Sequence, residues 1–417
     1  MNDRPSGVER VVLVHVNFPT EKMAEDLEEF KELATSAGAE IVAVVTCSRK
    51  VPEAKYFIGS GKAEEIRAIV SLHKADLVIF NHVLSSAQER NIEQLVKGRV
   101  IDRTGLILDI FAQRARSFEG KLQVELALLK HQSTRLVRGW THLERQRGGI
   151  GLRGGPGETQ LEVDRRQIRS KIKLITERLD KLRKQRELGR RARRKAIIPT
   201  VALVGYTNAG KSTLFNRLTG SDVYVANKLF ATLDPTLRRV EFPGAHPFIL
   251  ADTVGFIRHL PHDLVEAFHA TLEEVSAADL LLHVVDAQDE DKQLHLEQVE
   301  EVLTTIQAQA VPRMIVYNKI DLVPELQPQI DRDEAGKARR VYVSATKAIG
   351  LAELVRAIEE LLENEIVESD IVLAPKQAKL RAMLYARQAV LSESADDEGN
   401  HHLKVRLPRV ELEKLFR

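Results

Sequence analysis

The chain has 417 residues, of which 43% are hydrophobic and 29% are charged, and its formal net charge is +2. This length predicts two or three domains, and the apolar content excludes an intrinsically disordered chain. The single Cys47 excludes an intramolecular disulfide and is typical of a reducing compartment. The apolar run Val11–Val16 is too short to span a bilayer, so we expect a cytoplasmic protein without a membrane-spanning or targeting segment.

The small net charge hides a strong separation of charge along the chain. Residues 103–195 carry 25 Lys and Arg against 10 Asp and Glu, whereas the remainder carries 37 against 50. The most basic part, Arg165–Lys195, has 15 basic and 3 acidic residues. This separation favours a contact with nucleic acid or another anionic surface, and a merely solvated basic helix is the alternative.

Residues 8–115 are predicted to form an N-terminal parallel α/β domain, because short apolar runs alternate with amphipathic stretches. The expected strands are Val11–Val16, Ile41–Thr46, Leu77–Phe80 and Val100–Ile101, and the expected helices are Glu21–Ala37, Lys62–His73 and Ser85–Val96. The run Gly59-Ser60-Gly61-Lys62 opens the second helix. It lacks the full phosphate-loop motif, so a simple helix start is favoured over phosphate binding.

Residues 116–196 are predicted to form an antiparallel helical hairpin that projects as an arm. Each helix has one narrow apolar stripe, formed by Leu122, Leu126, Leu129, Leu136, Trp140 and Leu143 in the first helix and by Leu161, Ile168, Ile172, Ile175, Leu179 and Leu182 in the second. Two such stripes most simply bury each other. The glycine-rich segment 147–157 joins them, and binding residues concentrate on such tips. The RNA-contact candidates are Arg147, Arg153, Arg190, Arg191, Arg193 and Arg194.

Residues 197–365 are predicted to form a second α/β domain with a mixed, mostly parallel sheet. The expected strands are Thr200–Val204, Leu237–Phe242, Pro247–Ala251, Leu280–Val285, Arg313–Tyr317 and Val341–Val343, followed by a closing helix at Leu351–Leu362. Residues 366–417 are expected to form a small α+β module with a helix at Lys376–Leu391, a turn at Ser392–Asn400 and a strand at Leu403–Leu407. This module has no chemical signature.

A phosphate-loop motif, GxxxxGK[ST], lies between the first strand and the first helix of this second domain. Its residues are Gly205, Tyr206, Thr207, Asn208, Ala209, Gly210, Lys211 and Ser212. Backbone N–H groups of such a turn, together with the positive end of the helix, bind phosphate oxygens. Lys211 is the expected catalytic cation on the β and γ phosphates, and the Ser212 hydroxyl is an expected Mg²⁺ ligand.

Four further segments follow in the order that a guanine-nucleotide site requires. They are Phe230, Ala231, Thr232, Leu233 and Asp234; then Asp252, Thr253, Val254 and Gly255; then Asn318, Lys319, Ile320 and Asp321; and finally Ser344, Ala345 and Thr346. Thr232 is predicted to bind Mg²⁺ only when a γ phosphate is present. Asp252 would hold the metal through a water, and the Gly255 amide would approach the γ phosphate.

The base-recognition residues predict guanine rather than adenine. Asp321 would accept hydrogen bonds from the N1–H and the exocyclic amine of guanine, and the Ala345 amide would face the base carbonyl. Adenine offers no matching donors, so the carboxylate would be left unpaired. The five segments together predict a P-loop GTPase that binds GTP, GDP and Mg²⁺, since each is weak alone but the ordered set is specific.

One residue differs from the pattern of many signalling GTPases at a position that matters for catalysis. Phe256 follows Gly255, where many signalling GTPases have the glutamine that orients the attacking water. A phenyl ring cannot polarise water. We therefore expect slow intrinsic hydrolysis that a large partner stimulates.

The sequence resembles the HflX-type ribosome-associated GTPases over about residues 10–365. The most specific matching runs are Tyr56–Lys62, Gly154–Glu162 and Gly255–Phe268, and a hydrophobic residue in place of the glutamine is also usual in that family. The resemblance implies a cytoplasmic protein that acts on the large ribosomal subunit and its rRNA. It also implies that the protein splits or rescues stalled ribosomes under stress, with GTP favouring the bound state.

Two other functions stay open at this point. The first is a nucleotide-regulated, rRNA-binding assembly scaffold with little turnover. The second is a peripheral membrane GTPase whose basic arm lies on anionic lipid. The narrow apolar seam of the hairpin argues against the second, because it leaves no wide face for a bilayer. We expect a monomer.

Overall fold

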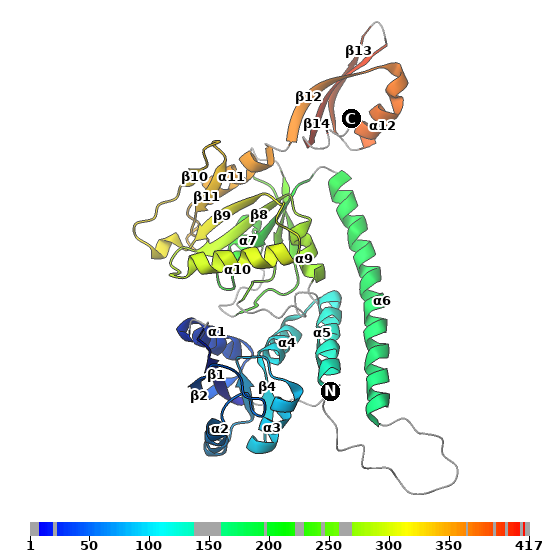
Figure 1. Ribbon diagram of the computed structural model, residues 1–417. Helices are drawn as coiled ribbons and strands as arrows, with labels where there is room; N and C mark the ends of the chain where they lie inside the picture. Colours follow the sequence, from blue (N-terminus) through cyan, green and yellow to red (C-terminus); the bar gives the residue numbers. More distant parts are fainter. Residues whose placement is uncertain are drawn as a thin grey trace, which may run out of the picture. The chain divides into compact units, whose positions relative to one another are not determined.

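The computed structural model describes residues 8–19, 23–136, 160–195, 198–221, 229–242, 247–257, 269–363, 366–386, 389–396, 399–408 and 412 (Figure 1). They form two compact units. The N-terminal unit contains the described residues up to Lys181 together with Leu229–Leu233, and the C-terminal unit contains the other described residues. Within these described ranges, no helix has both the length and the apolar composition needed to cross a bilayer.

A four-stranded parallel sheet forms the centre of the N-terminal unit (Figure 1). Its strands are β1 (Arg10–Asn17), β2 (Glu40–Ser48), β3 (Leu77–Phe80) and β4 (Arg99–Ile101), in the order β2-β1-β3-β4. The four predicted strands are confirmed. The two central strands, β1 and β3, are buried on both faces, as expected for a parallel sheet whose crossover helices cover it.

Five helices accompany this sheet: α1 (Met23–Ser36), α2 (Ser60–His73), α3 (Ser86–Val96), α4 (Arg103–Arg114) and α5 (Phe118–Leu136). Helix α2 packs with α3, and α4 packs with α1 and α5. The sequence pattern does not predict α4, because its buried side chains surround the helix instead of forming a stripe. Helix α2 begins at Ser60, directly after its N-cap Gly59, and so the helix start predicted for this run is confirmed.

The two arm helices are α5 and α6 (Gln160–Lys195). Of the predicted stripes, Leu122, Leu126, Leu129 and Ile175 are buried. The segment that joins the helices, with Arg147 and Arg153, lies outside the described residues. Helix α6 includes positions 190–194 in its backbone, and the side chains of the four arginines there lie outside the described set.

The C-terminal unit contains a seven-stranded sheet in the order β10-β11-β9-β8-β5-β7-β6. Its strands are β5 (Thr200–Val204), β6 (Thr236–Val240), β7 (Phe248–Asp252), β8 (Leu280–Asp286), β9 (Arg313–Asn318), β10 (Ile330–Arg332) and β11 (Ala338–Tyr342). The β6–β7 and β10–β11 pairs are antiparallel and the others are parallel, so the predicted mixed, mostly parallel sheet is confirmed. The sequence pattern does not predict the three-residue β10.

The helical segments around this sheet are α7 (Lys211–Thr219), α9 (His269–Ser276), α10 (Lys292–Thr305), η2 (Ile320–Leu322) and α11 (Leu351–Glu363). Apolar residues of α7 and α11 share one core with the strands. This packing holds the start of α7 at the carboxyl end of β5, where open α/β sheets place their ligands.

The C-terminal module is a three-stranded antiparallel sheet with one short helix. It contains β12 (Ile366–Leu373), η3 (Pro375–Gln377), α12 (Ala378–Ala386), β13 (Val390–Ala395) and β14 (His401–Pro408), with the strands in the order β12-β14-β13. The predicted helix to Leu391 is wrong at its end, because α12 stops at Ala386 and β13 begins at Val390. Pairing of β13 with β14 overrides the local helical pattern, and the predicted turn is shortened to Asp396–Asn400.

Candidate nucleotide-binding site

The turn between β5 and α7 has the backbone geometry of a phosphate cradle. Gly210 has φ +93°, and a Cβ there would lie 2.2 Å from Asn318 Nδ2, so only glycine fits. Thr207 Oγ1 is buried and has no hydrogen-bond partner among the described residues. A buried polar atom without a partner is costly unless a ligand satisfies it. The unpartnered Thr207 hydroxyl indicates room for a polar ligand, and the absence of a side chain at Gly210 lets Asn318 pack against the turn.

Lys211 is buried at the first position of α7. Its Nζ donates to the carbonyl oxygens of Gly205 (3.0 Å) and Tyr206 (2.7 Å). Burial lowers the pKa of Lys211 to about 8, and the nearby Asp252 carboxylate opposes that shift. The ammonium is therefore desolvated and only partly compensated, which favours an incoming phosphate.

The oxygens suited to a magnesium ion lie beside this lysine. Ser212 Oγ donates to Asp252 Oδ2 at 2.7 Å, and Asp252 at the end of β7 is fully buried. Thr253 Oγ1 donates to the Leu203 carbonyl at 2.6 Å, which connects β7 to β5. A hydroxyl and a carboxylate are hard oxygen donors of the kind that Mg²⁺ prefers. The residues present thus fit the predicted metal.

Gly255 and Phe256 contact the phosphate loop through their main chains. A Cβ on Gly255 would lie 2.7 Å from Thr207 Cγ2 and 3.0 Å from Lys211 Nζ, so a larger residue would displace the lysine. Phe256 N–H donates to the Gly205 carbonyl (3.2 Å), and the Phe256 carbonyl accepts from Thr207 N–H (2.8 Å). The Phe256 ring is only 1% exposed. It supplies packing and no proton donor or acceptor for a water.

The base side of the site is organised by Asn318 at the end of β9. Asn318 Nδ2 donates to the Ala209 carbonyl (2.9 Å), and Asn318 Oδ1 accepts from Ala345 N–H (3.0 Å). One buried side chain therefore connects the phosphate loop with the loop after β11. Lys319 Nζ pairs with Asp286 Oδ2 at 2.7 Å, and Asp321 on η2 is exposed. The exposed carboxylate is placed to meet a ligand from solvent.

Thr232 lies in a segment that packs with the N-terminal unit. In this segment Phe230 is buried edge-to-face against Phe111 of α4, with ring centroids 4.7 Å apart, and Leu229 N–H donates to Ser36 Oγ at 3.0 Å. The structure therefore brings Ser212 and Asp252 together but groups Thr232 with the N-terminal unit. Asp234 belongs to the C-terminal unit.

The structure also reveals two site neighbours that the motifs do not name. Asp286, the partner of Lys319, ends β8, and the rule that ligands lie at carboxyl ends of strands could have indicated it. Arg217 on α7 donates to the carbonyls of Ala345 and Thr346. No local sequence signal marks Arg217, because its partners lie more than a hundred residues away.

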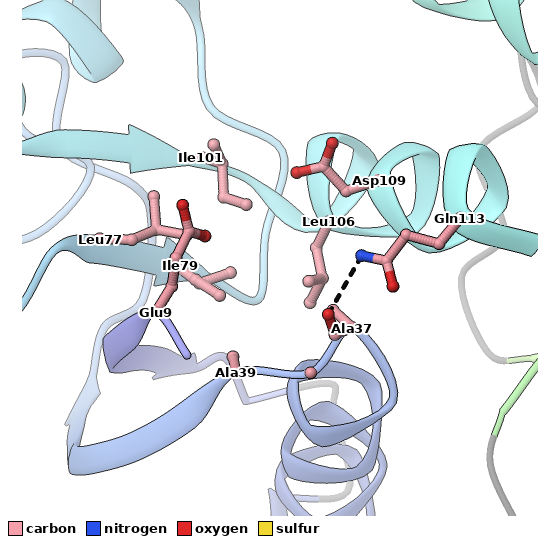
Figure 2. A pocket seen from close by; sticks show the side chains of 10 residues that line it. Glu9, Ala37, Ala39, Leu77, Ile79, Ile101, Leu106, Asp109 and Gln113 are labelled. Carbon is pink, nitrogen blue, oxygen red and sulfur yellow. Dashed lines mark hydrogen bonds between the residues drawn. The ribbon is translucent and has the colours of Figure 1, made fainter. Parts of the chain in front are cut away.

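A cavity of about 130 Å³ lies in the N-terminal unit, between α1, α4 and the strands (Figure 2). Its lining residues are Glu9, Ala37, Gly38, Ala39, Leu77, Ile79, Ile101, Leu106, Asp109 and Gln113. Gln113 Nε2 donates to the Ala37 carbonyl (3.1 Å), and Glu9 pairs with Arg99 (3.0 Å). None of the predicted nucleotide-binding residues lines this cavity.

Three family models match the chain. They are described as "GTP-binding GTPase N-terminal" over residues 24–112, "GTP-binding GTPase Middle Region" over 114–193 and "50S ribosome-binding GTPase" over 200–319. A relative, GTPase HflX of Escherichia coli (strain K12), is 56% identical over 415 residues, which cover 100% of this chain and 97% of the relative. The chain belongs to the HflX family of GTPases. The resemblance stated from the motifs is confirmed.

Other proteins are similar over most of the chain. A second GTPase HflX, from Caldanaerobacter subterraneus subsp. tengcongensis, is 50% identical and covers 96% of this chain and 91% of the relative. A crystal structure of a GTP-binding protein from Sulfolobus solfataricus in complex with GDP has 25% identity and a TM-score of 0.45, and covers 86% of this chain and 99% of that one. Membership of the HflX family makes this protein a GTPase, with GTP and GDP as its nucleotides.

Proposed function

We propose that this HflX-family GTPase binds GTP with Mg²⁺ along the carboxyl edge of the β5, β7 and β9 strands. Lys211 and the phosphate-loop amides hold the phosphates, Ser212 and Thr232 bind the metal, and Gly255 contacts the γ phosphate. The observation that carries this proposal is the desolvated Lys211 beside the paired Ser212 and Asp252. Mg²⁺ would neutralise charge on the β and γ phosphates when bound.

A calorimetric titration tests the metal assignment. Ser212→Ala should weaken the Mg²⁺ dependence of GTP binding while leaving Mg²⁺-free GDP binding nearly unchanged. The matched control is Ser221→Ala, in the loop after α7. An unchanged Mg²⁺ dependence in Ser212→Ala would refute the assignment.

We further propose that the guanine base lies between Asp321 and the Ala345 amide. Asn318 supports this placement, because it already connects the loop of Ala345 to the phosphate loop. Asp321→Asn should reduce the affinity for GDP and improve the affinity for xanthosine diphosphate, which offers an acceptor where guanine has its amine. Loss of both nucleotides in equal measure would contradict this placement.

The cellular function that we propose is cytoplasmic: the GTP-bound protein attaches to the large ribosomal subunit and splits or rescues stalled ribosomes under stress. The family description "50S ribosome-binding GTPase" and the basic helix α6 support this proposal. Cosedimentation should show binding to large subunits that is about 5- to 150-fold tighter with a non-hydrolysable GTP analogue than with GDP. Equal binding in both nucleotide states would refute nucleotide control.

The arm arginines are proposed to contact rRNA phosphates. Changing Arg190, Arg191, Arg193 and Arg194 to Ala should weaken subunit binding and lower the salt slope by about one for each lost phosphate contact. The matched control changes Lys171 and Lys173, which are exposed earlier on α6. GDP affinity should stay unchanged in both variants. A parallel loss of GDP binding would show that these arginines do not act in rRNA contact alone.

A second function, the rRNA-binding assembly scaffold with little turnover, is favoured by the buried Phe256, which cannot orient water. Turnover measured with and without large subunits separates the two functions. Stimulation by large subunits supports the ribosome-acting GTPase, whereas slow turnover that subunits leave unchanged supports the scaffold.

A further inference from the structure

The side chain of Arg217 connects the phosphate-binding helix to the loop after β11. Its Nε donates to the Ala345 carbonyl at 3.1 Å and its Nη2 donates to the Thr346 carbonyl at 3.0 Å. Arg217 lies on α7, the helix that begins with Lys211. Although Arg217 is exposed, its planar fork is committed to two successive main-chain carbonyls.

The loop that Arg217 contacts runs from Ser344 to Ile349, and hydrogen bonds between these two residues close it. Ser344 and Ile349 exchange main-chain hydrogen bonds of 2.9 and 3.0 Å, and Ser344 Oγ accepts from Lys347 N–H at 3.1 Å. These bonds hold the two ends together. The carbonyls of Ala345 and Thr346 lie between those ends and are directed to Arg217.

The Ala345 residue is therefore held from two sides. Its N–H donates to Asn318 Oδ1 at 3.0 Å, while its carbonyl accepts from Arg217 Nε at 3.1 Å. Asn318 comes from β9 and Arg217 from α7, so two elements that also organise the phosphate loop determine how Ala345 is oriented. A rotation of Ala345 would have to break one of these bonds.

We propose that Arg217 is a positioning residue for guanine recognition. It acts by holding Ala345 so that its one N–H, which donates to Asn318 Oδ1, is shared with the base carbonyl O6 when guanine is bound. This inference rests on the base placement proposed above. Because Arg217 acts through the loop, it affects both the affinity for guanine nucleotides and the contribution of O6 to that affinity. The coupling also makes the base loop and the phosphate-binding helix respond together to the nucleotide.

The test compares three nucleotides on Arg217→Gln and on the unsubstituted protein. GDP carries O6, the N1–H and the exocyclic amine. The 6-thio analogue of GDP keeps both donors for Asp321 but replaces O6 by sulfur, a weak acceptor. Inosine diphosphate keeps O6 but lacks the amine. Affinities come from calorimetry, and GDP dissociation rates come from displacement of a fluorescent analogue.

Arg217→Gln should weaken GDP binding by about tenfold, mainly through faster dissociation, because hydrogen bonds from a charged donor are lost. The preference for GDP over 6-thio-GDP should fall toward one. The preference for GDP over inosine diphosphate should stay unchanged, because Asp321 reads the amine. Arg217→Lys should recover part of the GDP affinity, and Arg339→Gln, at an exposed position on β11, should change nothing.

Two results would overturn the inference. GDP affinity and the GDP to 6-thio-GDP ratio could both remain at the values of the unsubstituted protein. Alternatively, all three nucleotides could lose affinity equally, together with a lower unfolding midpoint of the nucleotide-free protein, as expected for a purely structural arginine. If the unsubstituted protein does not distinguish GDP from 6-thio-GDP at all, the base placement itself fails, and that failure is separate from the behaviour of Arg217→Gln.

Discussion

The parallel sheet of the N-terminal unit and the mostly parallel sheet of the C-terminal unit both carry polar residues at the carboxyl ends of their strands, but these residues have different kinds of partner. At the end of β4 in the N-terminal unit, Asp102 is fully buried and pairs with Arg135 of α5 at 2.7 Å. Asn81, at the end of β3, contacts His15 (2.9 Å) and accepts from Arg103 (2.7 Å). These side chains pair with one another across elements of the same unit.

At the corresponding edge of the C-terminal sheet, the polar groups are arranged around a turn instead. Among the described residues, Lys211 Nζ donates to two main-chain carbonyls of its own loop, and burial lowers the pKa of Lys211 while the nearby Asp252 carboxylate raises it. Polar residues at the ends of strands therefore do not by themselves identify a binding site. In a structural network the buried charged side chains pair with one another, whereas in a binding site a buried charged group such as Lys211 is left for a ligand to neutralise.

The largest effect is expected from breaking the N-terminal network. Asp102→Ala should lower the free energy of unfolding of the N-terminal unit by about 3–5 kcal/mol, because it removes the N-cap of α4, leaves the Gly105 and Leu84 N–H groups without their acceptor, and takes away one of the two carboxylates that pair with Arg135. It should leave GDP affinity unchanged. Denaturant unfolding followed by circular dichroism measures the first quantity, and calorimetry measures the second.

Glu64→Ala is the control for this prediction, since Glu64 forms an exposed pair with Arg67 at 3.0 Å and should cost less than about 1 kcal/mol. A loss of GDP binding in Asp102→Ala that parallels the loss of stability would show that the two sheet edges do not differ as described.

The next effect concerns the lysine of the phosphate loop. Lys211→Ala should lower GTP and GDP affinity by about 100-fold, because hydrogen bonds to charged groups are worth about 1.5–3 kcal/mol. The free energy of unfolding of the nucleotide-free protein should not fall, since the substitution removes a buried ammonium. Lys337→Ala, at an exposed position, should behave like the unsubstituted protein. A decrease below threefold would contradict the assigned role.

A smaller effect should appear as a pH dependence. The pKa of Lys211 is lowered from 10.5 to about 8 in the folded protein, so the nucleotide-free protein loses this proton as the pH rises through 8. GDP affinity should fall above pH 8, approaching tenfold per pH unit, with proton uptake on binding. The free energy of unfolding without nucleotide should rise between about pH 8 and 10.5, because only the unfolded state keeps the proton.

Calorimetry in buffers of different ionisation enthalpy measures that proton uptake. The Lys211→Ala variant should lose both pH dependences. If the two dependences persist in the variant, another group is responsible.

The smallest effect is expected at the glycine-lysine run of the N-terminal unit. Lys62 pairs with Glu65 at 2.9 Å on the first turn of α2, at a partly exposed site. Lys62→Ala should therefore change the free energy of unfolding by less than about 1 kcal/mol and leave GTP hydrolysis unchanged. A large loss of GTP hydrolysis would show that this run acts in nucleotide chemistry after all.

Much of the fold could be predicted from the sequence where an element has a continuous apolar run or one apolar face. The strands β1–β5 correspond to apolar runs in the sequence, and α2 and α3 correspond to amphipathic stretches. Helix α4 could not, because it is buried nearly all round and only a narrow strip with Asp109 and Gln113 is not buried. Strand β13 could not either, because its partner β14 determines its conformation.

The sequence by itself determined that this protein is a GTPase, because Gly205–Ser212 and the later motifs are contiguous segments, and the nucleotide binding that we propose for them depends on their local backbone. Only the tertiary structure decided which distant groups support them. Arg217 meets Ala345 and Leu229 meets Ser36 through packing of elements far apart in the chain. A side chain leaves no periodic or local signal of a partner whose position depends on how the whole sheet and its helices pack.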